Sequence, residues 1–283
     1  MKLIQRFLIC ILVLAFSIIP LAQAEGNIHD LIQSGAPLTT KNQLLGHIPH
    51  VDDNFRVLQG GCVNEEYGWF ALIGADKAKH YPLTECYILK FRLDTMEEVA
   101  RSQVLKLGHA NDITYLPETN ELYVIHVTGR QISILDADTL EIKGKKRMTT
   151  EAYALDYDPA TQRIVIALGT MGMLMYNDLD LKTDSVCGYG FPLESTLVTQ
   201  GICCDDTYIY HVLWSPDSNT QEPDNVIVVF DWEGKEITRI PIGLKGMEPE
   251  NISLVNDIFY ISFNQADIPG AELLYKMQLV EEE

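Results

Sequence analysis

Short runs of alternating apolar and polar residues, separated by turn residues, follow one another from Gln59 onward. The clearest case is the stretch GHANDITYLPETNELYV, residues Gly108–Val124, in which two apolar runs flank a turn containing Pro117 and Asn120. Alternation with a period of two is typical of half-buried β-strands, and no apolar repeat of helical period persists beyond a few residues. The pattern therefore predicts an all-β fold.

The same plan occurs five times along the chain, each time opened by a polar residue. The opening residues are Gln59, His109, Glu151, Gln200 and Glu250, at spacings of 50, 42, 49 and 50 residues. A period of about 40 to 50 residues fits four strands per repeat, which is the size of a propeller blade. Five repeats predict a five-bladed β-propeller.

The last repeat is too short to form a complete blade. After Ile258–Asn264 and Glu272–Leu279 only Val280 and three glutamates follow, and an unpaired edge strand invites aggregation. We expect a segment between about Lys41 and Val57 to close blade five as its outer strand. The predicted organisation is a signal peptide at 1–24, an N-terminal lead-in with the closing strand at 25–57, and the five-bladed propeller at 58–283.

The beginning of the chain resembles a secretory signal. Lys2 and Arg6 precede the apolar run Phe7–Ile19, and the small residues Ala22 and Ala24 form a cleavage site. The run is shorter than the roughly 20 residues that a spanning helix needs. We expect a secreted, periplasmic or extracellular protein with no stable membrane anchor after cleavage; an uncleaved anchor is the alternative.

The chain is strongly acidic, with a formal net charge of −19. Loss of Lys2 and Arg6 with the signal leaves 40 acidic against 19 basic side chains, a net charge of −21. Such a surface repels nucleic acid, so no nucleic-acid partner is expected. We expect a monomer.

Five cysteines remain after cleavage, in no CxxC spacing and with no histidine at ligand spacing. This argues against a zinc site and against a full disulfide framework. Buried small apolar side chains are the preferred interpretation, and one disulfide is the alternative.

Candidate binding residues follow from the repeats, because the first strand of each blade lines the central channel of a propeller. The five opening residues would ring one mouth of that channel, with further polar and aromatic side chains beside them. The predicted ligand-binding set is Gln59, His109, Asn111, Asp112, Glu151, Tyr153, Gln200, Trp214, Glu248 and Glu250. The alternative is that these side chains only solvate a water-filled channel.

Long predicted loops between the second and third strands support the same mouth. They span Gly74–Glu85, Ser215–Asp224 and Gln265–Ala271, in three blades that are neighbours in a closed ring. His80 and Tyr81 lie in the first of them, whereas Trp69 is expected in the core. Aromatic rings beside carboxylates and amides suit a glycan.

Whether the protein is an enzyme stays open at this point. Glu250, Glu151 and His109 are candidate catalytic residues, since burial could raise the pKa of one carboxyl for acid and base work. No GxSxG, HExxH or glycine-rich phosphate loop indicates a reaction. No cofactor and no dedicated metal site are predicted, although calcium is possible at Glu250, Asp112 and nearby carbonyls.

Two resemblances follow from particular residues. The blade plan with Gly108-His109-Ala110-Asn111-Asp112 resembles secreted bacterial β-propellers of the broad NHL and YVTN type over Gln59–Val280. This resemblance implies architecture and not activity. Thr199-Gln200-Gly201-Ile202 is similar to a blade opening of the five-bladed glutaminyl cyclases, which would imply a metal-bound cyclase, but the Gly-Glu-Gly and Asn-Glu-Leu-Glu runs of that family are missing.

The leading hypothesis is an exported propeller that binds a small polar ligand, a glycan or cell-envelope fragment, at the channel mouth. A glycan- or lactone-directed hydrolase or lyase that uses channel carboxylates and a histidine is the alternative. A glutaminyl-cyclase-like enzyme and a protein-interaction scaffold are minor alternatives.

Overall fold

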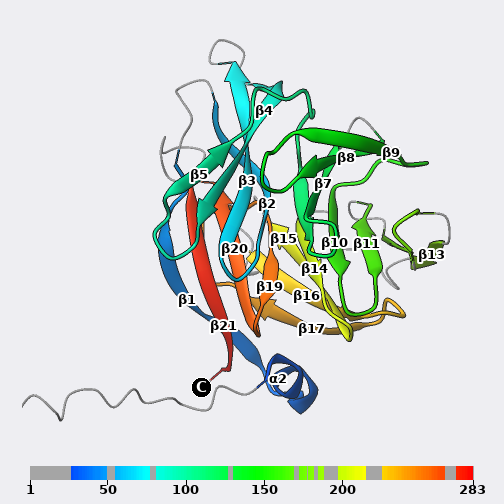
Figure 1. Ribbon diagram of the computed structural model, residues 1–283. Coiled ribbons are helices and arrows are strands. Elements are labelled where there is room, and N and C mark those ends of the chain that lie inside the picture. Colours follow the sequence, from blue (N-terminus) through cyan, green and yellow to red (C-terminus); the bar gives the residue numbers. More distant parts are fainter. Residues whose placement is uncertain are drawn as a thin grey trace, which may run out of the picture.

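The computed structural model describes residues 27–49, 55–76, 81–126, 130–168, 172–176, 178–181, 184–187, 197–214, 225–264 and 272–282. The predicted signal peptide lies outside these residues. The described part is nearly all β, with one short helix, α2 (Ile28–Ser34), as Figure 1 shows. No helix in the described part is long and apolar enough to cross a membrane.

The strands form five sheets, each made of consecutive antiparallel strands, so the predicted five-bladed β-propeller is confirmed. Blade one contains β2 (Phe55–Val63), β3 (Tyr67–Asp76), β4 (Tyr81–Arg92) and β5 (Glu98–Arg101). Blade two contains β6 (Asp112–Leu116), β7 (Glu121–His126), β8 (Gln131–Asp136) and β9 (Ile142–Arg147). Blade three contains β10 (Ala154–Asp158), β11 (Arg163–Ala167), β12 (Met173–Tyr176) and β13 (Asp184–Cys187). Blade four contains β14 (Val198–Cys204), β15 (Tyr208–Trp214), β16 (Asn225–Asp231) and β17 (Glu236–Pro241).

Blade five is completed by the N-terminal part of the chain, as the sequence predicted. Its own strands are β18 (Glu248–Pro249), β19 (Ser253–Val255), β20 (Ile258–Asn264) and β21 (Leu273–Glu281). The outer strand is β1 (Leu38–His47), which pairs antiparallel with β21 from Leu38 opposite Glu281 to His47 opposite Leu273. The edge of β21 is therefore covered.

Turn residues explain how consecutive strands connect. Leu140 and Met96 both have positive φ, at 60° and 57°, and each donates its backbone N–H to a carbonyl four residues earlier. Met96 lies in the turn between β4 and β5, and Leu140 lies in the turn between β8 and β9. Asn120, with φ of 52°, reverses the chain between β6 and β7.

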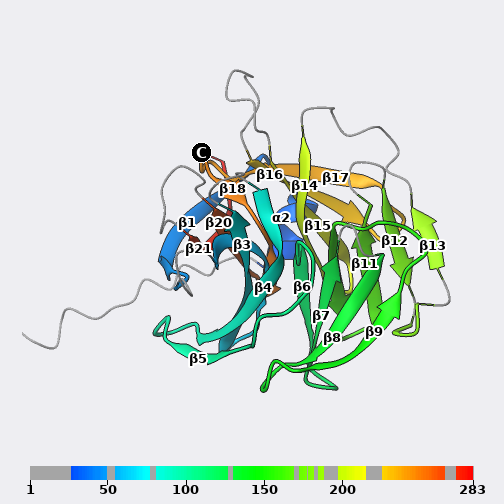
Figure 2. The same ribbon diagram turned by 90° about the horizontal axis from the view of Figure 1, so that it is seen from above.

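The core lies between the blades and not inside any one of them. Five clusters of buried apolar side chains each join two neighbouring sheets, and one of them, with Phe70 and Leu274, joins blade five to blade one. Trp69 belongs to the cluster between blades one and two; it is 1% exposed and donates from Nε1 to the carbonyl of Ala137, as its predicted core position requires. Figure 2 looks down on the resulting ring of sheets.

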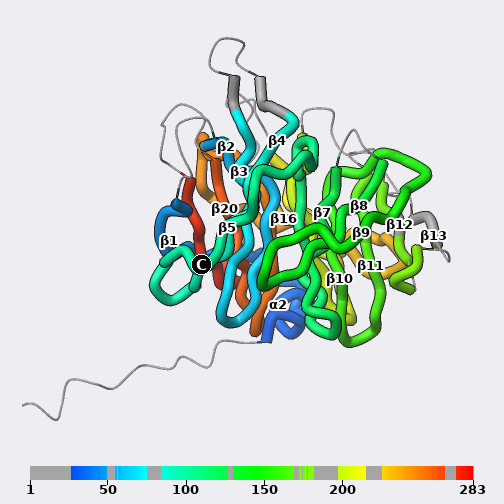
Figure 3. Tube along the Cα trace, turned by 45° about the horizontal axis from the view of Figure 1, so that its top comes forward, coloured from blue at the N-terminus to red at the C-terminus, as the bar shows by residue number. Residues whose placement is uncertain are grey.

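The inner strands β2, β6, β10, β14 and β19 contact one another in a closed ring. They begin on one side of the ring, the upper face in Figure 1, and end on the opposite side, the lower face. Figure 3 shows α2 at the lower face, opposite the hairpin of β3 and β4. The two faces are therefore distinct surfaces around the two ends of the channel.

The loop predicted at Gly74–Glu85 is mostly strand. Ala75 pairs with Pro82 and Asp76 with Tyr81, so β3 and β4 extend as a hairpin and leave only 77–80 between them. The sequence pattern missed this because Pro82 and the polar residues around it are poor strand formers. His80 and the predicted loops 215–224 and 265–271 lie outside the described residues.

Candidate functional site

The strand pairing sets which inner-strand positions are equivalent. Cys62, Thr114, Asp156, Cys203 and Ser253 each pair with a residue of the second strand, four of these partners being aromatic. The residues three positions earlier in each blade are Gln59, Asn111, Tyr153, Gln200 and Glu250. His109 and Glu151, the opening residues taken from the sequence, stand two positions before the equivalent sites in blades two and three.

Local irregularities in the inner strands mark several of these positions. The register shifts between Leu58 and Gly61 and between Thr199 and Ile202, which places Gln59 and Gln200 in β-bulges. Glu250 lies between β18 and β19, where the inner strand of blade five is interrupted. A β-bulge changes the direction in which a side chain points, and bulges are over-represented beside active sites.

Glu250 has the most unusual environment among the predicted site residues. Its side chain is 4% exposed, and its Oε1 atom has no hydrogen-bond partner among the described residues. Burial, and then the nearby charge of Glu248, raise the pKa of this carboxyl well above its ordinary value, and a hydrogen bond with Asn264 only partly opposes the rise. A buried carboxyl with an unsatisfied oxygen is a candidate ligand-contacting group.

Glu248 and Gln200 form the wall next to Glu250. Gln200 Nε2 of blade four donates to Glu248 Oε1 of blade five at 2.8 Å. Burial raises the pKa of Glu248, and this hydrogen bond lowers it. The structure thus brings Gln200, Glu248 and Glu250 together at the junction of blades four and five.

His109 and Asn111 of blade two lie together, just before β6. Both are half-buried, and burial lowers the pKa of the His109 imidazole, an effect that the Asn111 side chain opposes. The equivalent of Asn111 in blade one, Gln59, is buried and donates from Nε2 to the carbonyl of Leu58.

Other predicted site residues have separate environments. Glu151 is exposed, and its Oε1 lies 3.8 Å from Nη2 of Arg130, so its carboxylate is in contact with solvent. Tyr153 is half-buried and donates its backbone N–H to the carbonyl of Ala167. Trp214 is half-buried at the end of β15, where it pairs with Asn225 of β16.

Asp112 is buried in the wall between the blades and not at a mouth of the channel. Its Oδ1 accepts from Ile113 N at 3.0 Å, and its Oδ2 accepts from Leu155 N of blade three at 3.1 Å. Burial raises the pKa of Asp112, and these backbone donors oppose the rise. Both carboxylate oxygens of Asp112 accept backbone hydrogen bonds, which fits a role in joining blades two and three.

Asn251 joins blades five and one in a similar way. Its Nδ2 donates to the carbonyl of Gly61, and its Oδ1 accepts from Ser262 N at 2.9 Å. Buried amides that are fully hydrogen-bonded in this way stabilise one arrangement of the chain.

One group of three side chains in the described part is close enough to hold a metal ion, and it consists of His29, Asp205 and Asp206. Asp205 already accepts hydrogen bonds from Tyr208 N and Tyr210 Oη, at 2.7 Å each, and contacts His29 Nε2 at 2.9 Å. The contact with His29 attaches α2 to blade four, and the two tyrosine bonds lie within blade four, so hydrogen bonds account for this group. Calcium at Glu250 and Asp112 stays an alternative from the sequence.

The described cysteines are consistent with the preferred interpretation from the sequence. Cys62, Cys86, Cys203 and Cys204 are all buried and free. Burial raises the pKa of each thiol, which favours the unreactive protonated form.

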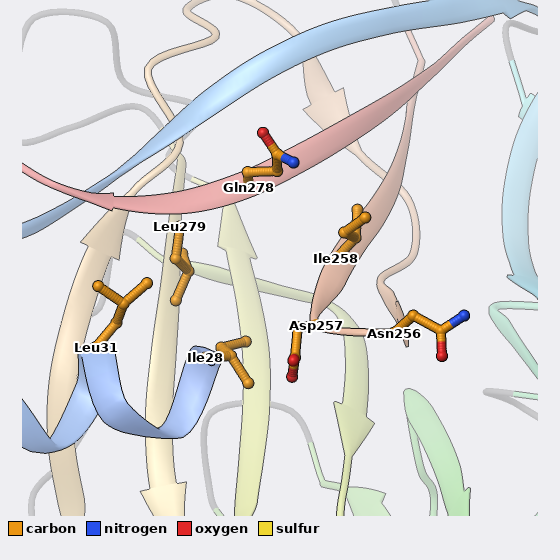
Figure 4. Close-up of a pocket in the computed structure, with 7 residues that line it drawn as sticks. All are labelled: Ile28, Leu31, Asn256, Asp257, Ile258, Gln278 and Leu279. Carbon is orange, nitrogen blue, oxygen red and sulfur yellow. The ribbon is translucent and has the colours of Figure 1, made fainter. Parts of the chain in front are cut away.

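A small cavity lies between α2 and blade five. Figure 4 shows its lining, which includes Ile28 and Leu31 of the helix and Asp257 of the turn before β20. Its volume is about 140 Å³. Ligand pockets usually exceed about 300 Å³, so this cavity is a packing gap beneath the helix.

Asn264 is a site residue that the sequence analysis missed. It ends β20, pairs with Glu248 across the sheet, and its side chain hydrogen-bonds Glu250. The signal was present in the sequence, since Asn264 is a polar residue that directly follows the apolar run Ile258–Phe263.

Comparison with known proteins identifies the architecture. The sequence matches no protein-family model and no curated protein. Among solved structures, the chain is similar to the glutaminyl cyclase of Myxococcus xanthus, with a TM-score of 0.61 and 13% identity over 87% of this chain and 100% of that chain. It is also similar to a member of the DUF4221 family from Bacteroides vulgatus, with a TM-score of 0.48 and 11% identity over 86% of this chain and 99% of that one. At 13% identity the likeness to the Myxococcus xanthus protein shows a shared fold alone.

Proposed function

We propose that this protein binds a small polar ligand at the site formed by Glu250, Glu248 and Gln200. The observation that carries the proposal is the buried Glu250 carboxyl, whose Oε1 has no hydrogen-bond partner among the described residues. An unsatisfied buried oxygen costs about 1 to 3 kcal/mol, a cost that a ligand donor removes on binding.

The chemistry of the site indicates a ligand rich in hydrogen-bond donors. Two carboxyls and the amides of Gln200 and Asn264 offer several acceptors close together. Glycans and cell-envelope fragments carry hydroxyl and amide donors at such density. The half-buried Trp214 ends β15, a strand that contacts β18 with Glu248, and its ring is of the kind that stacks on sugars.

The proposal includes an exported protein. Its support is the signal-like sequence at 1–24 and the resemblance of the blade plan to secreted NHL and YVTN propellers. Release of the processed chain into the periplasm or medium would test export directly.

A binding screen with a matched variant tests the ligand site. Wild-type protein and Glu250→Gln are titrated with a glycan array and with soluble muropeptides, followed by calorimetry of the hits. We expect binding to the wild type and a loss of about tenfold or more in the variant, because the charged acceptor is removed. Equal affinity of the two folded proteins for every hit would overturn the proposal.

A second candidate function is cyclisation of an N-terminal glutaminyl residue. It is supported by the fold similarity to the whole length of the Myxococcus xanthus glutaminyl cyclase and by the run Thr199–Ile202. In this reaction the α-amine attacks the side-chain amide carbon, a C–N bond forms, and ammonia leaves. Protonated Glu250 would give its proton to the leaving nitrogen and recover one from the attacking amine.

Ammonia release separates the two functions. A glutaminyl peptide incubated with wild-type protein should release ammonia and form a pyroglutamyl end, and Glu250→Gln should abolish both. Glycan binding without ammonia release would leave the first function and reject the second.

A further inference from the structure

The end of the channel opposite to the Glu250 site contains a larger cavity. Its volume is about 370 Å³, and its lining residues come from all five blades, at the ends of the inner strands on the lower face. This volume is within the range of small-molecule sites.

The cavity and the Glu250 site have no described residue in common. None of Gln200, Glu248 and Glu250 is among the described residues that line the cavity. Between the two ends the inner strands pack closely, since a Cβ on Gly60 would lie 2.2 Å from the Cα of Asp112 and a Cβ on Gly201 would lie 2.6 Å from the Cα of Asn251. The cavity is therefore described as a site of its own.

Asp156 is the charged group inside the cavity. It is half-buried in β10, its Oδ1 accepts from Thr114 Oγ1 at 2.5 Å, and its Oδ2 accepts from Cys204 N at 2.9 Å. The Tyr157 backbone and the Cys204 side chain also hydrogen-bond this carboxyl, so what Asp156 offers the cavity is its negative charge.

The charged side chains among the described lining residues are acidic. Apart from Asp156, the described lining has one carboxylate, that of the exposed Glu65 at the rim, and no lysine, arginine or histidine. The remaining lining is neutral, with apolar surface from Leu254 and Val255 and a hydroxyl on Ser253. A partly open site whose charged groups are carboxylates and whose walls are partly apolar favours a cation that has an alkyl part.

We propose that the lower-face cavity is a second ligand site, which takes a small primary alkylammonium ion with its charged end at Asp156 and its alkyl chain against Leu254 and Val255. The ammonium group is attracted by the negative charge of Asp156, and the short chain covers the apolar wall. This site is independent of the ligand proposed at Glu250.

An isosteric series of probes tests the charge requirement. The full chain is titrated with butylammonium, n-butanol and butyrate, and binding is followed by the amide chemical shifts of Thr114, Asp156 and Ser253. Butylammonium should saturate these shifts at millimolar concentration, whereas n-butanol and butyrate should bind at least about tenfold more weakly. Equal response to butylammonium and n-butanol would overturn the proposal.

Three variants test the residues. Asp156→Asn should weaken butylammonium binding about tenfold, and Glu65→Lys should also weaken it, since it places a positive charge at the rim without touching the core. Glu97→Lys changes the net charge equally at an exposed position outside the lining and should leave the affinity unchanged. If Asp156→Asn does not fold, the test is the difference in butylammonium affinity between Glu65→Lys and Glu97→Lys. The same affinity in both variants would contradict the proposal. Glu250→Gln should bind butylammonium as the wild type does.

Discussion

The side-chain amide of Gln200 donates to the carboxylate of Glu248 at 2.8 Å, and this bond crosses from blade four to blade five. The bond positions the carboxyl of Glu248, which lies next to that of Glu250. Burial raises the pKa of both carboxyls. Gln200 therefore lowers the cost of placing two acidic side chains at one end of the channel.

Replacing Gln200 by Glu should destabilise the protein in a pH-dependent manner. A third carboxylate at this point repels Glu248 once it ionises, so the loss should be small near about pH 4 and reach about 2 kcal/mol near about pH 7. Urea unfolding at both pH values measures the difference. The matched control is Gln43→Glu on the exposed strand β1, and an equal pH dependence in the two variants would contradict the prediction.

The pH dependence of activity should separate the two functions proposed for Glu250. Its pKa is raised above the ordinary 4.5, so the carboxyl stays protonated to higher pH than a solvent-exposed glutamate. Binding of a hydroxyl-rich ligand to the carboxylate should strengthen as pH rises through the raised pKa, because a charged acceptor forms. Catalysis that uses the protonated acid should weaken over the same interval. Calorimetry for binding and ammonia release for turnover measure the two trends, and a flat profile for both would remove Glu250 from either role.

Gly201→Ala should disrupt the contact between blades four and five. A Cβ at this position would lie 2.6 Å from both Asn251 Cα and Ile252 N, which are backbone atoms that cannot rotate away. We expect a loss of about 3 kcal/mol or more in unfolding free energy. Gly144→Ala is the control, since the nearest atom to its Cβ would be Ile134 Cδ1 at 3.9 Å, and it should change stability by less than about 0.5 kcal/mol.

The close approach at Gly201 also explains which parts of the fold the sequence could predict. Strand alternation and repeat length depend on local residue order, so five blades and the N-terminal closing strand were correctly predicted. The contact between Gly201 and Asn251 depends on the ring being closed, and residues 50 positions apart in the chain give no local sign of it.

The site was predictable as a set of residues but not as an arrangement. The side chains of Gln200 and Glu248 are hydrogen-bonded and Glu250 lies close to Glu248, whereas Asp112 has its oxygens engaged by backbone donors of its own and the next blade. The sequence placed the opening residues of blades two and three at His109 and Glu151, two positions before the equivalent residues Asn111 and Tyr153. This difference arose because the chain leading into β6 and β10 differs in length from the bulged strands β2 and β14. Only hydrogen-bond pairing reveals such a bulge.

Asp156 should make the stability of the protein fall as pH rises from mildly acidic values. Burial raises its pKa from 3.8 to about 6, and the hydrogen bond from Thr114 partly opposes this. Between these values the unfolded chain releases a proton that the folded protein retains, so rising pH favours unfolding by at most about 3 kcal/mol. Asp156→Asn lacks this proton, so the wild type should lose stability relative to the variant from about pH 4 to about pH 7.

The Thr114→Val variant tests whether the raised pKa of Asp156 causes this pH dependence of stability. Removing the hydroxyl raises the pKa of Asp156 further, so the interval in which stability falls should extend to higher pH. Chemical unfolding across the pH range measures both variants. A difference between wild type and Asp156→Asn that does not change with pH would contradict the assignment.

Deleting residues 25–47 should abolish cooperative folding, because it removes β1 and leaves the edge of β21 without its partner. The loss is expected to exceed about 5 kcal/mol, which is comparable to the total stability of a domain, and unfolding followed by circular dichroism should lose its sigmoidal transition. Deleting only residues 25–35 removes α2 and its buried Ile28 and Ile32 but retains β1, so that control should unfold cooperatively at a lower temperature. A synthetic peptide of residues 36–49 added to the longer deletion should restore part of the transition, since β1 pairs with β21 through backbone hydrogen bonds. A longer deletion that unfolds cooperatively at the wild-type temperature would show that blade five does not need its N-terminal strand.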